Sequence, residues 1–157
     1  GVEDASFDVV IVNSVLNLAW DLKEALRETA RAIAPGGFLY HAGVFADEPL
    51  PLAAMQAFAR AGNVFGAARS QGEFARIAVD RAGFSSCSFE RERPVEPDGT
   101  DIAEELIGRS FTAAVACARR RAMKSCMRSS PKQEAAMTHN GSRTLSFIVL
   151  RRNGTWY

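Results

Sequence analysis

The sequence predicts an α/β domain built on a parallel sheet, and three observations carry this prediction. An unbroken apolar run, FDVVIV at residues 7–12, is typical of a strand buried on both faces. A stripe of apolar residues with helical spacing follows it, and a second apolar run, FLYHAGVFA, occupies residues 38–46. A strand, a crossover helix and a strand in this order form a βαβ unit, so we expect two parallel strands with a right-handed connection.

The crossover helix has clear start and stop signals. Asp21 is placed to cap its first turn, with Glu24 at the third helical position, and apolar residues recur every three or four positions as far as Ile33. The sequence Pro35-Gly36-Gly37 then ends the helix, because proline cannot continue it and glycine accepts the left-handed exit conformation. We expect this helix to lie on the sheet.

The rest of the chain predicts further helices and strands. Residues 50–61 are typical of a short helix over the carboxyl edge of the sheet, and Ser70 to Glu73 form a capping box for a helix that Gly83 ends. A short helical segment is expected at residues 101–107, closed by Gly108. Strands are expected at residues 85–92, 111–118 and 145–152.

Composition restricts the class of protein. The chain has 157 residues, of which 47% are hydrophobic and 24% charged, as in soluble globular domains. No apolar run reaches the roughly 18 to 20 residues that span a bilayer, and acidic residues stand where a signal peptide would carry Lys or Arg. The three cysteines form neither a CxxC pair nor an even set, which favours reduced thiols. A cytoplasmic location, no membrane and no metal site are therefore expected.

Charge divides the chain into two parts. Residues 119–157 hold nine Lys or Arg and one acidic residue, a charge of +8, which leaves −7 for residues 1–118. The basic part carries no aromatic stacking pattern or nucleic-acid motif, so no nucleic-acid partner is expected. We expect it to pair with the acidic part, within one chain or between subunits. Solvation of the tail is the alternative.

Several of these segments together resemble a known family. They are FDVVIVNSVLNL, IAPGGFLYHAGVF, GNVFGAARSQGEF and the apolar strand after EELIG. They resemble the C-terminal half of a class I S-adenosylmethionine-dependent methyltransferase, nearest the branch that contains arsenite methyltransferases. The resemblance implies a partial Rossmann-like sheet, strands four to seven of the family pattern, with flanking helices and a basic C-terminal extension. It divides the chain into a truncated α/β domain at 1–118, a basic linker at 119–144, and a C-terminal strand and tail at 145–157.

The resemblance also implies S-adenosylmethionine as cofactor, a small-molecule substrate and a set of site residues. Asn13 and Ser14 would lie near the methionine part of the cofactor, and Asn17, Trp20 and Asn63 would face the substrate. The alternative is structural: Asn and Ser often satisfy backbone groups at strand ends, and an aromatic residue there often covers the core. No catalytic residue is assigned.

Two departures from the family bear on this site. No GxGxxG motif or equivalent cofactor loop occurs in the sequence, which puts binding by this chain alone in doubt. In addition, Ser14 and Asn63 stand where the arsenite branch has cysteines, and hydroxyl and amide groups are poor ligands for a thiophilic centre. Arsenic methylation is therefore not expected.

Two hypotheses of function remain open. The first is that the chain is methyltransferase-like, and its sequence leaves open whether it is an active enzyme. The second is that it is a non-catalytic module. The module would form a homo-oligomer or complete its sheet with a partner chain, because the strand at residues 7–12 would otherwise leave an unpaired edge. The strand at 145–152 would cover that edge within one chain or exchange between two chains. His41, inside the second strand, is expected to be a hydrogen-bonded core or edge histidine rather than a catalytic base.

Overall fold

A computed structural model describes residues 2–98, 103–122, 148–152 and 155–156. The predicted βαβ unit is present: β1 (Phe7–Asn13) is followed by α1 (Leu22–Ala32) and β2 (Ile33–Ala46), and the two strands pair in parallel. The side-chain oxygen of Asp21 accepts a hydrogen bond from Glu24 N–H, as the sequence predicts. Much of the predicted linker lies outside the described residues.

The sheet has six strands in the order β3-β4-β2-β1-β5-β6. β4 (Phe111–Arg120) runs antiparallel to both β2 and β3 (Phe84–Val95). On the other side of β1, β5 (Ile148–Arg152) pairs antiparallel with it, and β6 (Thr155–Trp156) follows. The β1 edge is therefore covered by a strand of the same chain.

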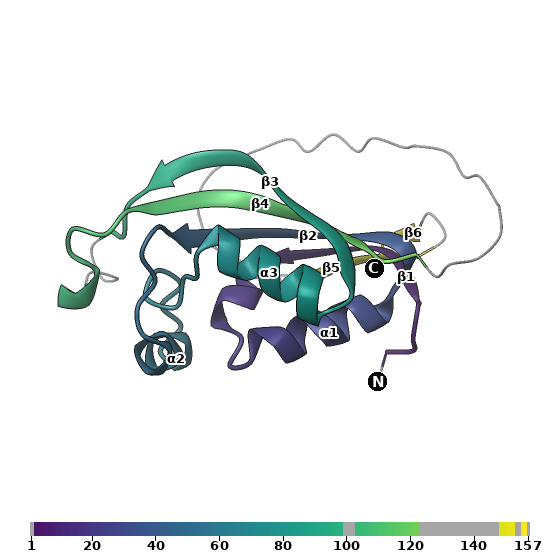
Figure 1. Cartoon of the computed structure of the whole chain (residues 1–157), viewed down its shortest axis with the longest axis horizontal. Coiled ribbons are helices and arrows are strands. Elements are labelled where there is room, and N and C mark those ends of the chain that lie inside the picture. Colours follow the sequence, from purple (N-terminus) through teal and green to yellow (C-terminus); the bar gives the residue numbers. More distant parts are fainter. Residues whose placement is uncertain (1, 99–102, 123–147, 153–154, 157) are drawn as a thin grey trace.

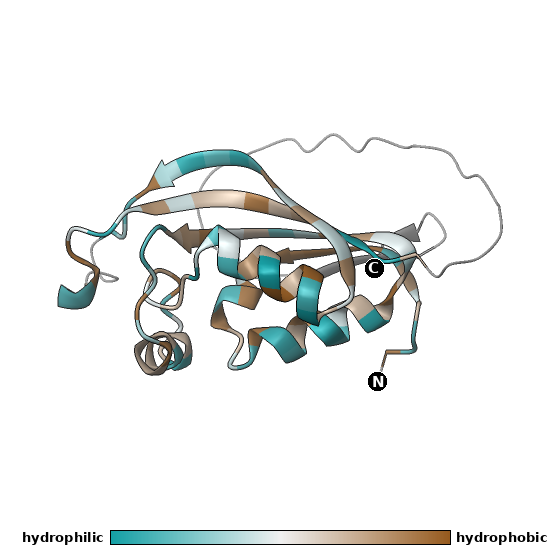
Figure 2. Cartoon of the chain, viewed as in Figure 1, coloured by the Kyte–Doolittle hydropathy of each residue, from teal (hydrophilic) through white to brown (hydrophobic). Residues whose placement is uncertain are grey.

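Helices α1 and α3 (Gln71–Arg81) lie on one face of this sheet, and α2 (Leu52–Arg60) lies near the carboxyl end of β2 (Figure 1). The main core forms between this face and the two helices, because alternate strand residues such as Val10, Val12 and Leu39 point toward them. Figure 2 shows the same helices with polar residues on their outer sides. Burying one stripe of each helix in this way holds the sheet and helices together.

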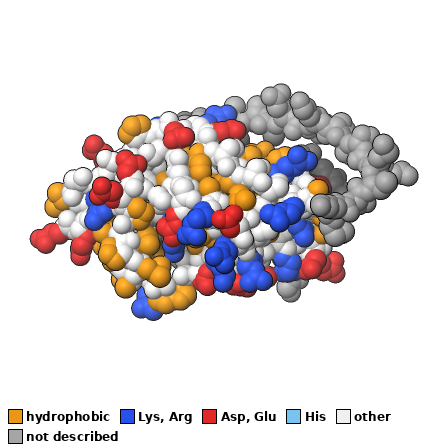
Figure 3. Space-filling model, in the orientation of Figure 1, with side chains coloured by type: hydrophobic (Ala, Val, Ile, Leu, Met, Phe, Trp, Pro, Cys, Tyr) orange, Lys and Arg blue, Asp and Glu red, His pale blue; other side chains and the backbone are white. Residues whose placement is uncertain are grey.

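A second core cluster closes the end of the molecule near α2. Met55 of α2 packs there with Leu106 of the short helix η3 (Glu104–Leu106) and with Phe111 of β4. Phe65 meets the Phe111 ring edge-on, with 5.2 Å between ring centroids. Apolar side chains also gather on the surface over α2 (Figure 3), where Leu52 is exposed.

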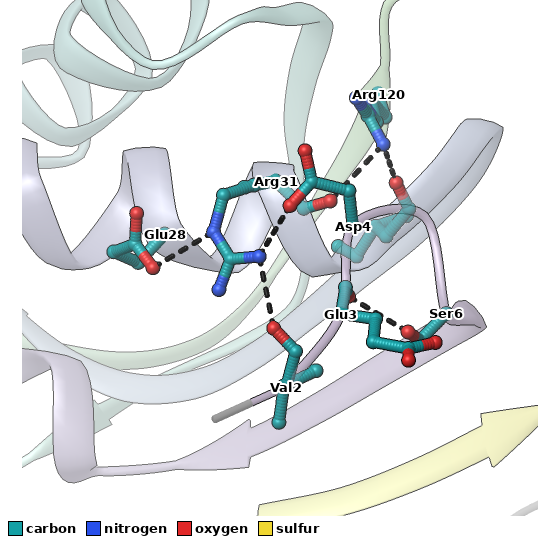
Figure 4. A network of polar contacts seen from close by, with 8 residues as sticks. Val2, Glu3, Asp4, Ser6, Glu28, Arg31 and Arg120 are labelled. Atoms are coloured by element: carbon teal, nitrogen blue, oxygen red, sulfur yellow. Dashed lines mark hydrogen bonds and ion pairs between the residues drawn. The ribbon is translucent and has the colours of Figure 1, made fainter.

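A polar network attaches the N-terminal segment to the end of α1 (Figure 4). Arg31 pairs with Asp4 (2.5 Å) and Glu28 (2.9 Å), and these hydrogen bonds raise the pKa of its guanidinium. Ala5 N–H donates to the Arg31 carbonyl (2.8 Å), and Arg120 donates to the Ile33 carbonyl. These contacts fix the chain just before β1 begins.

Two strands are longer than the sequence-based expectations, because β2 begins at Ile33 rather than at residue 38 and β3 continues to Val95 rather than to about residue 92. Ile33, expected as the last residue of the helical stripe, starts β2 and pairs with Phe7. A short helix or helical turn is expected at 101–107, and its described part, from residue 103, contains the single turn η3, which agrees with that expectation. The strand expected at 145–152 is described from Ile148 onward. In the described part of the chain no helix is long and apolar enough to cross a membrane.

Candidate functional site

The candidate site lies where β1 ends, at the carboxyl edge of the sheet. Ser14 has φ 58° and ψ −12°, a left-handed conformation that residues with a Cβ rarely adopt. Ser14 N–H donates to the Ala42 carbonyl of β2 (2.8 Å), and its hydroxyl donates to Asn13 Oδ1 (3.4 Å). A strained backbone held by its neighbours is typical of functional loops. The loop turns sharply here, with Asn13 half-buried and Ser14 buried (6% exposed) at the strand end.

Asn17 lies in the next turn, the 3-10 helix η1 (Val15–Leu18), and its side chain points into the protein. Its Nδ2 donates to the Val44 carbonyl of β2 (2.6 Å), while Oδ1 is buried and has no hydrogen-bond partner among the described residues. The backbone N–H of Asn17 donates to the Ser14 carbonyl (3.2 Å). Asn17 therefore supports the turn from beneath.

His41 lies under this turn on β2 and belongs to the core, as the sequence predicts. It is 1% exposed, and its ring stacks on Phe74 of α3 with 5.3 Å between centroids and meets Phe45 edge-on at 6.0 Å. Burial lowers its pKa to about 4, with the Val12 carbonyl acting in the opposite direction. The imidazole is therefore neutral at physiological pH, and its Nδ1 has no hydrogen-bond partner in the described part of the chain.

Trp20 and Asn63 lie beside α2. Trp20 is 51% exposed, Arg60 of α2 lies over its ring at 4.2 Å, and its carbonyl accepts a hydrogen bond from Gln56 (3.5 Å). Asn63 Oδ1 accepts from Gly66 N–H (2.9 Å) and so shapes the loop after α2. Asn13, Ser14 and Asn17 thus share one turn, whereas Trp20 and Asn63 are tied to α2 and its loop.

Two cavities define the space near these residues. One of about 10 Å³ is lined by Asn17, His41 and Phe74. The other, of about 320 Å³, lies between the end of β2 and the start of α3 and is lined by Asp47, Gln71 and Glu92, among others. Asn13 and Ser14 line neither cavity, and small-molecule sites usually measure roughly 300 to 1,000 Å³.

Neither of these two cavities lies at Asn13 and Ser14, so neither encloses a cofactor at the end of β1. The polar side chains at this strand end are those of Asn13, which is half-buried, and Ser14, which is buried. Within the described ranges no group of three or more His, Cys, Asp or Glu side chains could hold a metal ion.

Sequence reasoning did not predict that His41 and Asn17 line the same small cavity beneath the turn. The alternation of residues in β2 does indicate that His41 faces the core, because Leu39 and Phe45 lie on the same face of the strand and are both buried.

Comparisons with known proteins agree with this fold. A family model described as a methyltransferase domain matches residues 1–41. The arsenite methyltransferase of Aquipseudomonas alcaligenes is 34% identical over 111 residues, 71% of this chain and 32% of that protein. The mouse (Mus musculus) arsenite methyltransferase is 39% identical over 51 residues, 32% of this chain and 14% of that protein. The chain thus spans about a third or less of these relatives.

Solved structures of methyltransferases are also similar to this chain. The arsenic(III) S-adenosylmethionine methyltransferase of Chlamydomonas reinhardtii superposes with a TM-score of 0.65 at 25% identity, covering 80% of this chain and 41% of that one. A methyltransferase from Methanosarcina mazei shares the fold, with a TM-score of 0.51 at 15% identity over 78% of this chain and 63% of that one. S-adenosylmethionine is the cofactor of this family. The chain is thus a relative of the class I S-adenosylmethionine-dependent methyltransferases, near the arsenite methyltransferase branch.

Proposed function

We propose that the chain supplies one wall of a methyl-transfer site for a small organic substrate. The observation that carries this proposal is the strained turn at Ser14, which is fixed to Ala42 and lies at the strand end, the place where ligands of open α/β sheets bind. Asn13 is half-buried there and Ser14 is buried. Asn13 and Ser14 would contact the methionine part of the cofactor. Asn17 would hold the turn, and Trp20 and Asn63 would border the substrate.

The chemistry asked of these residues is mainly geometric. The cofactor, when bound, supplies an electrophilic methyl group on its sulfonium. The protein then has to hold the acceptor atom in line with that methyl group and to exclude water, which is where positioning contributes most. Among the described residues we assign no general base, because His41 is buried beneath the turn.

The same residues argue against arsenite as the substrate. Arsenic(III) prefers thiolate ligands, and the two positions that would carry them hold Ser14 and Asn63. The described cysteines, Cys87 and Cys117, lie in β3 and β4, and burial raises the pKa of the Cys87 thiol to about 11. We therefore propose an organic acceptor.

The missing cofactor loop defines what else the site needs. The 157 residues contain no glycine-rich loop of the GxGxxG kind. We propose that the remaining walls come from residues outside these 157 or from a partner chain.

A non-catalytic module is the second candidate function. It would bind a partner through its sheet, as a homo-oligomer or with a different chain. The sheet face away from α1 and α3 favours this candidate, because half-buried apolar side chains such as Val9, Ile11 and Val115 lie on it. Parallel strands are normally covered on both faces. Sedimentation that shows a monomer at every concentration would contradict the homo-oligomer.

Calorimetry tests the enzyme proposal. S-adenosylhomocysteine is titrated into the chain alone and into a fusion with the part of the Chlamydomonas reinhardtii relative that this chain does not cover. We expect no saturable binding by the chain alone and micromolar binding by the fusion. Asn13→Ala should weaken that binding at least tenfold, whereas Ser85→Ala on the exposed part of β3 should not. A folded fusion that binds equally well with Asn13→Ala would contradict the proposal.

A further inference from the structure

A small cavity with a mainly apolar lining and the polar side chains of Asn17, His41 and Arg69 lies beneath the turn that carries the candidate site. Its volume is about 10 Å³, and its lining includes Asn17 of η1, His41 of β2 and Phe74 of α3. A cavity of about 10 to 15 Å³ holds one water molecule, provided that polar groups line it. This cavity meets both conditions.

Two polar atoms of the lining residues lack partners. His41 Nδ1 and Asn17 Oδ1 are buried, and neither has a hydrogen-bond partner within the described residues. The amide of Asn17 is fixed in orientation, because its Nδ2 donates to the Val44 carbonyl (2.6 Å), so Oδ1 is an acceptor. A neutral imidazole offers one donor and one acceptor. Buried polar groups are nearly always hydrogen-bonded, often through an ordered water.

Gly43 explains how the two side chains come together. A Cβ at this position would lie 2.5 Å from His41 Nε2, the ring nitrogen other than the unpartnered Nδ1, and 2.6 Å from Asn17 Oδ1, so the His41 ring and Asn17 Oδ1 both lie against the bare backbone of Gly43. Any larger residue would push one of them away. The lack of a side chain at residue 43 thus leaves room for an imidazole and an amide on one side of β2.

We propose that one water molecule occupies this cavity and links His41 to Asn17, which makes His41 a positioning residue for the turn at Ser14. The water donates a hydrogen bond to Asn17 Oδ1 and exchanges a second one with the imidazole. Asn17 in turn donates its backbone N–H to the Ser14 carbonyl (3.2 Å), so fixing Asn17 fixes the strained residue. This inference concerns the protein without any ligand and goes beyond the proposed function.

The first test is direct observation of the water in the full chain. A crystal structure at high resolution should show one water within hydrogen-bond distance of His41 and of Asn17 Oδ1. The ring nitrogens should give NMR shifts of a neutral, hydrogen-bonded imidazole at neutral pH. Absence of density in an ordered cavity would overturn the proposal.

The second test removes the nitrogens and keeps the ring. His41→Phe preserves the stacking on Phe74, and we expect amide hydrogen exchange at Asn17 to accelerate at least tenfold relative to α1 amides. Leu26→Val, a core change in α1, is the matched control and should not accelerate Asn17 selectively. Gly43→Ala, which fills the space, should reproduce the His41→Phe effect and expel the water. If the amide hydrogen exchange rate of Asn17 changes by less than twofold in both His41→Phe and Gly43→Ala, the positioning role of His41 is overturned.

Discussion

Acid should destabilise this protein through His41, and replacing His41 by Phe should remove that effect. The pKa of His41 is lowered from 6.5 to about 4 in the folded state, because the ring is buried. Between pH 6.5 and about pH 4 the unfolded chain therefore binds a proton at His41 that the folded chain does not bind. The free energy of unfolding is unaffected by His41 above about pH 6.5 and decreases as the pH falls below this value. The two pKa values differ by about 2.5, so full protonation of His41 at low pH lowers the free energy of unfolding by about 3 kcal/mol. About 2 kcal/mol of this loss occurs between pH 7.5 and pH 5.

The surroundings of His41 support the direction of this shift. The ring packs on Phe74 and Phe45, and the charged group that lines the same cavity is Arg69, whose guanidinium pairs with Glu73 (2.6 Å). Burial among these rings disfavours the charged imidazole and lowers its pKa, while the Val12 carbonyl acts in the opposite direction.

Denaturant unfolding at pH 7.5 and pH 5 measures the effect. The wild-type chain should lose about 2 kcal/mol more than His41→Phe over this range, equivalent to roughly 4 to 8 °C in melting temperature. The contributions of all other groups cancel in the difference between the two proteins. Equal losses in wild type and variant would refute the reasoning.

Three further predictions follow from the described contacts. Leu26→Ala should lower the free energy of unfolding by about 2 to 5 kcal/mol, because the side chain is 0% exposed in the main core. The control, Lys23→Ala on the exposed side of α1, should change it by less than about 0.5 kcal/mol, and urea titrations measure both. Cys87, whose pKa burial raises to about 11, should react with iodoacetamide at pH 7 roughly a hundredfold more slowly in the folded than in the unfolded chain; equal rates would contradict its burial. Ser14→Gly should stabilise the chain by up to about 1 kcal/mol and Ser14→Val should destabilise it, as thermal melting would show, because φ is 58° at this position.

Local sequence signals predict much of the fold. The caps at Asp21 and Ser70 accept hydrogen bonds from Glu24 N–H and Glu73 N–H, as their spacing predicts. Gly83 has φ 94° and lies directly after Ala82, the C-cap residue of α3, as the stop signal predicts. These features depend on residues three or four apart, so the sequence alone contains them.

Other features depend on contacts that no local pattern encodes. Ile33 fits the helical stripe, yet pairing with Phe7 draws it into β2. The direction of the Asn17 side chain is set by the Val44 carbonyl, which lies 27 positions away in sequence. The cavity under Asn17 needs His41 and Gly43 on the same side of β2, and its existence follows only once the turn is placed above that strand.

The most direct test of the account is to map where the cofactor binds. S-adenosylhomocysteine is titrated into the ¹⁵N-labelled fusion described above, and backbone amide shifts are followed by NMR. The account predicts that the largest shifts occur at Asn13 and Ser14, with smaller ones at Ala42, whose carbonyl holds the turn. Saturable binding whose shifts fall instead around Asp47 and Gln71, at the larger cavity, or leave the turn unchanged would contradict it.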